Sequence, residues 1–117
     1  MHTLFSMIDV EEDRVLAIGL SGGHYRPLLH SQVLTNIIDY GMNIQDAIEY
    51  PRFIWLIDSN VVGYEEELKP NNPRNRFIMK SYPYLSRMDV AAAVERNGRV
   101  IAGYCDIRGD GLPIGLP

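Results

Sequence analysis

The sequence predicts a single α+β domain over residues 1–117, in which helices cover one face of an antiparallel sheet. Three observations predict this class: two strand-like segments open the chain, two helical segments follow, and a strong hairpin signal comes near the end. Antiparallel strands with helices gathered on one face are typical of α+β proteins. A chain of 117 residues has room for one small domain with a modest core.

The chain opens with a predicted antiparallel hairpin and a glycine turn. Thr3–Val10 and Arg14–Leu20 are apolar segments of strand length, separated by the polar residues Glu11–Asp13. Ser21-Gly22-Gly23 ends the second strand, because paired glycines allow positive φ and the close approach of another group. Such a turn before a helix either aims backbone N–H groups at a developing negative charge or simply needs small residues for packing.

Two helices are predicted after this turn. Pro27 suits the first turn of the first helix, and Gly41 stands where a left-handed C-terminal cap belongs. Asn43 is a good N-cap for a short second helix over Ile44–Glu49, which ends before Pro51. The residues with helical spacing in the first helix are Leu29, Val33, Leu34, Ile37 and Ile38.

The middle of the chain gives weaker signals. Phe53–Ile57 is strongly apolar and is interpreted as a strand or a partner surface, and Val61–Tyr64 as another short strand. Glu65–Glu67 is interpreted as a solvated face at the start of a helical turn. Lys69–Arg76 has the Pro and Asn content of a loop, and no regular element is assigned to Phe77–Leu85.

A second hairpin is predicted near the end of the chain. Asp89–Glu95 and Arg99–Tyr104 flank Asn97-Gly98, and Asn-Gly between apolar segments is the strongest short hairpin signal. The tail, Cys105–Pro117, is rich in Gly, Asp and Pro and is expected to be irregular. The strands and the apolar segment offer more apolar surface than two helices can bury, which suggests a missing partner.

Composition and charge exclude several classes of function. A hydrophobic content of 46% and a charged content of 22% are ordinary for a soluble globular protein. The net charge of −4 argues against a nucleic-acid surface, and no apolar segment is long enough to span a membrane. The chain carries no signal peptide, so a cytoplasmic location is expected. Cys105 is expected to be a half-buried thiol in a strand.

Other candidate site residues give weak signals. His24 and His30 are not at metal-ligand spacing, so no metal site is expected. Asp106, Arg108 and Asp110 form a charged cluster, interpreted as a local ion-pair turn or a ligand site. Thr3 could act as an N-terminal nucleophile only after removal of the two residues before it.

The longest motif in the chain resembles the small-subunit signature of gamma-glutamyltranspeptidases and their acylase-like relatives. It comprises Gly22-Gly23, the segment Asp39-Tyr40-Gly41-Met42-Asn43, Ala47 and Pro51-Arg52-Phe53. A second segment, Gly103–Gly111, resembles the closing glycine-x-x-aspartate-proline-arginine-x-x-glycine element of that family. The resemblance covers Met1–Phe53 and roughly Val90–Leu116 and leaves the middle unmatched.

The resemblance implies part of an N-terminal-nucleophile hydrolase fold, a four-layer αββα sandwich formed by autocatalytic cleavage of a precursor. It implies that Gly22 and Gly23 supply the oxyanion hole, and it marks Thr3 and Ser21 as candidate substrate-binding residues. No cofactor or metal is implied. The family's catalytic threonine heads its small subunit, upstream of the matched segment, so this chain resembles only the C-terminal part of that subunit. The His2-Thr3-Leu4 segment is more similar to the acylase-like branch.

Two hypotheses follow from the resemblance. In the first, the chain is a fragment of an amide acyl-transfer or hydrolysis enzyme, linked to glutathione metabolism and inactive alone. Its partner is then an upstream polypeptide that carries the nucleophile and the large-subunit equivalent, and its substrate a γ-glutamyl compound or another amide. In the second, the chain is a stand-alone, non-catalytic remnant that self-associates or binds another protein through Phe53–Ile57. Neither hypothesis involves nucleic acid or a membrane.

Overall fold

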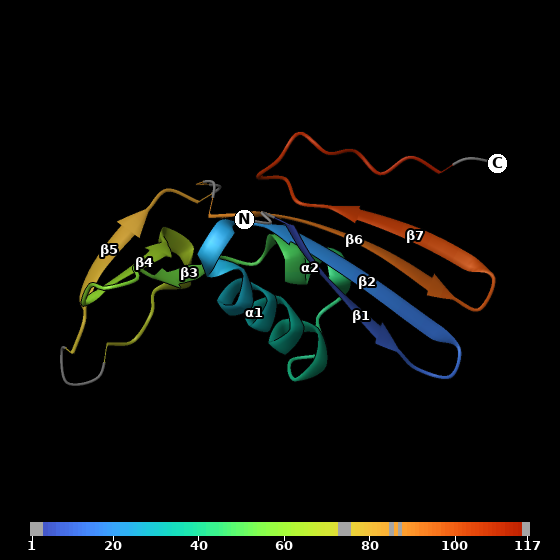
Figure 1. The fold of residues 1–117 in the computed structure, drawn as a ribbon, viewed down its shortest axis with the longest axis horizontal. Coiled ribbons are helices and arrows are strands. Elements are labelled where there is room, and N and C mark those ends of the chain that lie inside the picture. The colour runs from blue at the N-terminus through green and yellow to red at the C-terminus, as the bar shows by residue number, and fades with distance from the viewer. Residues whose placement is uncertain (1–3, 73–75, 85, 87, 116–117) are drawn as a thin grey trace.

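The computed structural model of the chain describes residues 4–72, 76–84, 86 and 88–115. Helices and strands alternate in blocks, as Figure 1 shows. The strands are β1 (Leu4–Val10), β2 (Arg14–Ser21), β3 (Phe53–Trp55), β4 (Val61–Glu65), β5 (Ile78–Tyr82), β6 (Val90–Asn97) and β7 (Val100–Cys105). The helices are α1 (Arg26–Ile38) and α2 (Ile44–Glu49), with short 3₁₀ turns η1 (Gly23–Tyr25) and η2 (Glu66–Leu68).

The main sheet has the order β1-β2-β6-β7 and is antiparallel throughout. Both predicted hairpins are present, and the second turns at Gly98, whose φ of 58° is the positive value that the Asn-Gly signal predicts. The two hairpins meet along β2 and β6, where Ser21 pairs with Val90 and Leu16 with Glu95. The end of the first hairpin thereby comes beside the start of the second.

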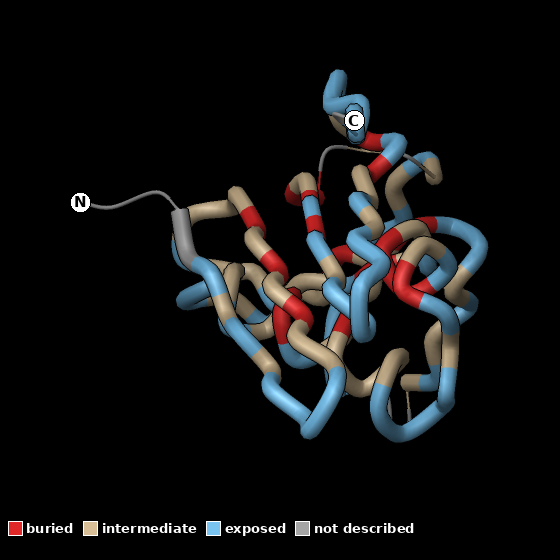
Figure 2. The backbone as a smooth tube through the Cα atoms, turned by 90° about the vertical axis from the view of Figure 1, so that its right-hand side faces the viewer, coloured by how far each residue is buried: buried red, intermediate tan, exposed pale blue. Residues whose placement is uncertain are grey.

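The core lies between this sheet and the two helices. Leu16, Ile18 and Leu20 alternate along β2, as expected for a strand that buries one face. They pack with Leu29, Val33, Ile44, Ile48, Ala91 and Ala93, all of which are buried. In Figure 2 the buried segments lie inside the molecule, and the hairpin ends and the described end of the C-terminal tail are exposed. The helices cover one face of the sheet, as predicted.

The helix ends follow the predicted signals. Pro27 lies in the first turn of α1, and Gly41 has a φ of 65° just beyond its C-terminus. Asn43 has extended backbone and accepts a hydrogen bond from the Asp46 N–H, so it caps α2. Tyr50, the residue before Pro51, leaves the helical region at ψ 140° and ends that helix.

A second, smaller sheet has the order β3-β4-β5 and was only partly predicted. The β3–β4 pair is antiparallel, as short consecutive strands usually are, but β4 and β5 are parallel. The parallel pair depends on the loop around residues 69–77, where the sequence shows no strand pattern. Residues 73–75, in the predicted loop, lie outside the described residues.

One prediction for this region is wrong. Glu65, assigned to a solvated face with Glu66 and Glu67, is 0% exposed, whereas its two neighbours are exposed. Glu65 is the last residue of β4 and shares the buried face of that strand with Gly63. The strand alternation therefore extends one residue further than the charge run suggests.

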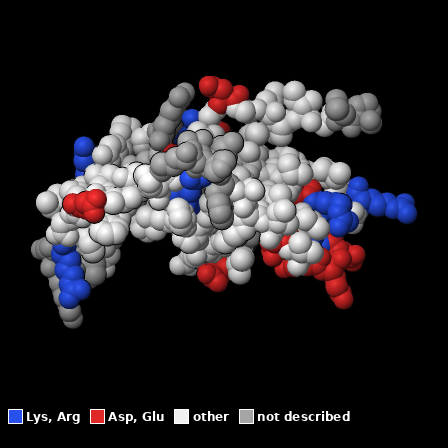
Figure 3. Space-filling model, viewed as in Figure 1, with Lys and Arg blue, Asp and Glu red and all other residues white. Residues whose placement is uncertain are grey.

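Charges of both signs are mixed on the face shown in Figure 3, and many gather at the hairpin end of the main sheet. That face carries no broad basic surface of the kind nucleic acid requires. Among the described residues, no helix is long and apolar enough to cross a membrane.

Candidate oxyanion site

The glycine turn joins the central strand β2 to the start of α1. Ser21 is the last residue of β2, Gly22 precedes η1, and Gly23 is the first residue of η1. The Tyr25 N–H donates to the Gly22 carbonyl at 3.3 Å, and the Arg26 side chain donates through Nε to the Gly23 carbonyl at 2.6 Å. The two carbonyls of the turn are therefore held in place.

The direction of one amide follows from these bonds. In a planar trans peptide the C=O and the next N–H point in opposite directions. Because the Gly22 carbonyl faces the helix, the Gly23 N–H points away from the helix start. Within the described part of the chain, neither the Gly22 nor the Gly23 N–H donates to a protein acceptor. Unpaired amides at the start of a helix are a ready site for an anionic oxygen.

The two glycines are needed for different reasons. Gly23 has a φ of 59° and open space around its Cα, so only the backbone conformation favours glycine there. Gly22 is extended in φ, but a Cβ on this residue would lie 2.2 Å from the Asp89 carboxylate. Such a contact is far below van der Waals distance, so a side chain at position 22 would force the Asp89 carboxylate to move.

Asp89 stands at the start of β6, against the glycine turn. It is 7% exposed, and its φ of 86° is unusual for a residue with a side chain. Burial raises the pKa of the Asp89 carboxyl, while the nearby Ser21 hydroxyl, the Val90 N–H and the Arg52 charge oppose this shift. The Ser21 hydroxyl lies near the carboxylate, but its hydrogen bond, at 3.5 Å, goes to the Val90 carbonyl.

A buried ion network joins β4, the residue before β3 and the turn after β7. It consists of Arg52, Glu65, Asp106 and Arg108, none of which is more than 4% exposed. Arg108 pairs with Glu65 at 2.5 Å and with Asp106 at 3.0 Å, and Arg52 pairs with Asp106 at 2.7 Å. The network joins the end of β4 to the turn after β7, and Asp106 also accepts from the Ala91 N–H in β6.

The pKa shifts of the two arginines follow from this arrangement. Burial lowers the pKa of Arg52, and its pairing with Asp106 only partly offsets that effect. Burial also acts to lower the pKa of Arg108, but the hydrogen bonds that Arg108 donates to Glu65 and the charge of Asp106 outweigh it and leave the pKa raised. Both guanidinium groups stay charged, as expected for arginine.

Comparison of the sequence with known protein families identifies the family of this chain. A sequence model of the gamma-glutamyltranspeptidase family matches residues 1–116. The chain belongs to the gamma-glutamyltranspeptidase family. It is 29% identical to the glutathione hydrolase-like YwrD proenzyme of Bacillus subtilis over 98% of its own length. That alignment spans 24% of the relative, so the chain corresponds to about a quarter of the proenzyme.

Solved structures of gamma-glutamyltranspeptidase relatives share the fold. The Bacillus anthracis transpeptidase CapD superposes with a TM-score of 0.81 at 21% identity, covering 97% of this chain and 70% of CapD. A gamma-glutamyltranspeptidase from Pseudomonas nitroreducens gives a TM-score of 0.77 at 19% identity, covering all of this chain and 63% of that one. The fold is therefore α+β and part of the αββα sandwich of N-terminal-nucleophile hydrolases, as the resemblance implied.

The structure brings some predicted residues of this gamma-glutamyltranspeptidase segment together and leaves others untested. Ser21, Gly22 and Gly23 are consecutive at the turn, whereas Thr3 lies outside the described residues. The Asp106 and Arg108 cluster is an ion pair, as interpreted, but it reaches across the fold to Arg52 and Glu65. Asp89 was not singled out, because nothing in the sequence signals a carboxylate that folds back against a turn 67 positions earlier.

The described histidines, His24 and His30, and Cys105 lie outside the glycine turn's anion site. His30 is buried in α1 and places Nδ1 3.0 Å from the Arg26 carbonyl, and His24 is exposed. Cys105 ends β7 and is half-buried, as predicted. Among the described residues, no group of three His, Cys, Asp or Glu side chains could hold a metal ion.

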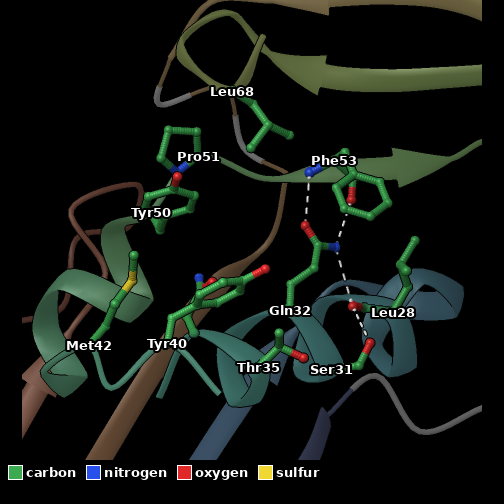
Figure 4. A pocket seen from close by; sticks show the side chains of 11 residues that line it. Leu28, Ser31, Gln32, Thr35, Tyr40, Met42, Tyr50, Pro51, Phe53 and Leu68 are labelled. Atoms are coloured by element: carbon green, nitrogen blue, oxygen red, sulfur yellow. Dashed lines mark hydrogen bonds between the residues drawn. The ribbon is translucent and has the colours of Figure 1, made fainter. Parts of the chain in front are cut away.

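A separate groove of about 480 Å³ lies between α1 and the strand β3 (Figure 4). Gln32 in α1 reaches across it, donating to the Phe53 carbonyl at 2.9 Å and accepting from the Phe53 N–H at 3.0 Å. These two bonds satisfy a backbone edge that would otherwise be open to pairing with another strand. The groove therefore lies along an edge of the small sheet that Gln32 protects from pairing with another strand.

Proposed function

We propose that the chain forms the C-terminal part of a gamma-glutamyltranspeptidase-like enzyme that transfers or hydrolyses an amide-linked acyl group. Its role is to supply the oxyanion-binding turn at Gly22 and Gly23. The observation that carries this proposal is the Gly23 N–H, which points away from the helix start and donates to no described protein group. The family resemblance implies that the threonine nucleophile lies upstream of the matched segment, and the proposed partner is the polypeptide that carries it.

The reaction follows from these roles. The threonine hydroxyl attacks the amide carbonyl carbon while its own α-amine takes the hydroxyl proton. The carbonyl oxygen becomes an oxyanion, which the N–H groups of Gly22 and Gly23 stabilise. When the tetrahedral intermediate collapses, the C–N bond breaks and the leaving amine receives that proton. Water or a second amine then attacks the acyl-enzyme ester and releases the threonine.

The sheet offers a surface for the upstream polypeptide. The face opposite the helices carries Ile8, Val94 and Ile101, which are 64%, 52% and 71% exposed. Small residues stand between them, because Ala17 pairs with both Ile8 and Val94 in the strand register. A flat apolar face of this kind fits a second sheet packed against it, which is the central contact of an αββα sandwich.

The role of the turn can be tested by removing one N–H. Glycolic acid at position 23 replaces the Gly23 N–H by an ester oxygen, and the same change at Gly41, also at positive φ, is the control. In the complete enzyme we expect kcat for γ-glutamyl anilide hydrolysis to fall about a hundredfold or more at position 23. We expect it to stay within about twofold at position 41. A loss of equal size at both positions would contradict the proposed role.

Self-association is the second candidate function, and the small sheet favours it. Phe53, Trp55 and Ile57 are 36%, 50% and 47% exposed and follow one another along β3 and the turn after it. A stable dimer through this surface needs about 1,000 Å² or more of buried area. Light scattering on the purified chain distinguishes the two states, and a monomeric mass across the accessible concentration range would remove this candidate.

A further inference from the structure

A cavity beside the glycine turn is not used by the proposed oxyanion chemistry. It has a volume of about 340 Å³ and lies between the turn, α1 and the small sheet. Its polar and aromatic walls are Gly22, Tyr25, Tyr82, Ser86 and Asp89. The oxyanion site and this cavity therefore share Gly22.

The cavity holds a carboxylate oxygen that no described group satisfies. Oδ1 of Asp89 accepts from the Val90 N–H at 2.8 Å, but Oδ2 is buried and has no hydrogen-bond partner. The Ser86 hydroxyl, which also lines the cavity, is buried without a partner as well. Buried polar atoms are almost always paired in native proteins, so two orphaned atoms in one cavity make it a candidate ligand site.

The backbone of Asp89 supports a functional role for this residue. Its φ of 86° is a conformation that aspartate adopts less easily than glycine. Gly22 in turn must lack a side chain to make room for the carboxylate. Two positions are thus constrained so that one charged group can face the cavity.

Among the described residues, Arg52 contacts the backbone of Asp89 but forms no ion pair with its carboxylate. Arg52 donates through Nη1 to the backbone carbonyl of Asp89 at 3.1 Å, and its other terminal nitrogen bonds to Asp106 and the Ile48 carbonyl. The Asp89 carboxylate is left with an unused acceptor in a cleft of low polarity. A cationic ligand would pair with the unused carboxylate oxygen of Asp89.

The walls favour an organic cation over a metal ion. A single carboxylate does not make a metal site, and no three-residue ligand group occurs among the described residues. Aromatic rings, in contrast, attract ammonium groups. Tyr82 already does so, since the Lys80 ammonium lies 5.0 Å from its ring centre, and the Tyr25 ring offers a second wall.

We propose that the cavity between Gly22 and Asp89 binds the protonated primary amine of a ligand, with Asp89 as the counter-ion. The inference deepens the proposed function, because a primary amine occurs both in amino-acid acyl donors and in amine acyl acceptors. In either case the ammonium is held next to the turn that receives the oxyanion. The reacting carbonyl and the amine are thereby positioned by the same turn.

The test measures binding without turnover. The ¹⁵N-labelled full chain, in the assembly that it forms, is titrated with n-butylammonium chloride, and the amide signals of Gly22, Met88 and Val90 are followed. We expect saturable shifts with the ammonium and none with n-butanol at matched ionic strength. Asp89→Asn keeps the size and tolerates positive φ, so we expect it to fold and to bind at least tenfold more weakly. Asp58→Asn is the matched control, an exposed aspartate with a φ of 60°, and should bind as the wild type does.

A second measurement uses only the wild type. The ¹³C shift of the Asp89 carboxyl is followed against pH with and without n-butylammonium, and a bound cation must move the titration midpoint to lower pH. Absence of saturation, an unmoved midpoint, or equal binding by Asp89→Asn would each overturn the proposal. If binding is seen but the complete enzyme has no amidase activity, the ammonium site stands and the proposed function fails.

Turnover then assigns the source of the amine. If the site holds the donor ammonium, n-butylammonium competes with γ-glutamyl anilide and raises its KM. If the site holds the acceptor, the ammonium accelerates aniline release, and Asp89→Asn abolishes this acceleration. Either pattern supports the ammonium site.

Discussion

At the scale of single residues, Gly22 and Asp89 depend on one another. The carboxylate occupies the space that a side chain at position 22 would need, and the glycine leaves that carboxylate facing a cavity. The glycine pair was predicted from the sequence, because adjacent glycines after a strand are a direct signal of a special turn. Its partner was not, because contact between the ends of β2 and β6 exists only after the two hairpins pair.

A double-mutant cycle tests this dependence. Gly22→Ala places a methyl group against the Asp89 carboxylate and should lower the free energy of unfolding by about 1–3 kcal/mol. In an Asp89→Gly background the clash is removed, so Gly22→Ala should lower the free energy of unfolding much less. We expect a coupling energy of about 1 kcal/mol or more from urea denaturation. Two substitutions whose effects simply add would show that the carboxylate is not what excludes a side chain at position 22.

At the scale of elements, the buried ion network fixes the small sheet to the main sheet. Glu65 ends β4, Asp106 and Arg108 follow β7, and Arg52 precedes β3. The sequence predicted Asp106 and Arg108 as an ion pair, because they are close in the chain. It assigned Glu65 wrongly, since a run of three glutamates resembles a solvated face. Extending the predicted strand by one residue would have placed Glu65 on the same face as Gly63, since strand side chains alternate.

Glu65 and Glu66 form a matched pair for testing the network. Glu65→Ala leaves the buried Arg108 without its closest partner and should lower the free energy of unfolding by about 3–5 kcal/mol. Glu66→Ala, one residue further along and exposed, should change it by less than about 0.5 kcal/mol. Both values come from chemical denaturation of the same preparation. If the two variants were equally stable, the buried pair would not be holding the sheets together.

At the scale of the whole molecule, the helices pack on one sheet face, and the other is exposed except where Pro113 approaches Gly103. The sequence indicated more apolar surface than two helices can bury. The exposed side chains of Ile8, Val94 and Ile101 confirm that the helices cover one sheet face only. The small parallel pair β4–β5 was not predicted, because parallel pairing depends on a long connection without a local pattern. The chain spans about a quarter of the curated relative it matches.

Complementation tests the central claim most directly. Aniline release from γ-glutamyl anilide is measured for this chain alone, for the upstream polypeptide alone, and for the two expressed together. The account predicts turnover only when both are present, because the oxyanion turn and the threonine nucleophile then lie in one site. Turnover by this chain alone, abolished by Thr3→Ala, would contradict it and would make Thr3 the nucleophile.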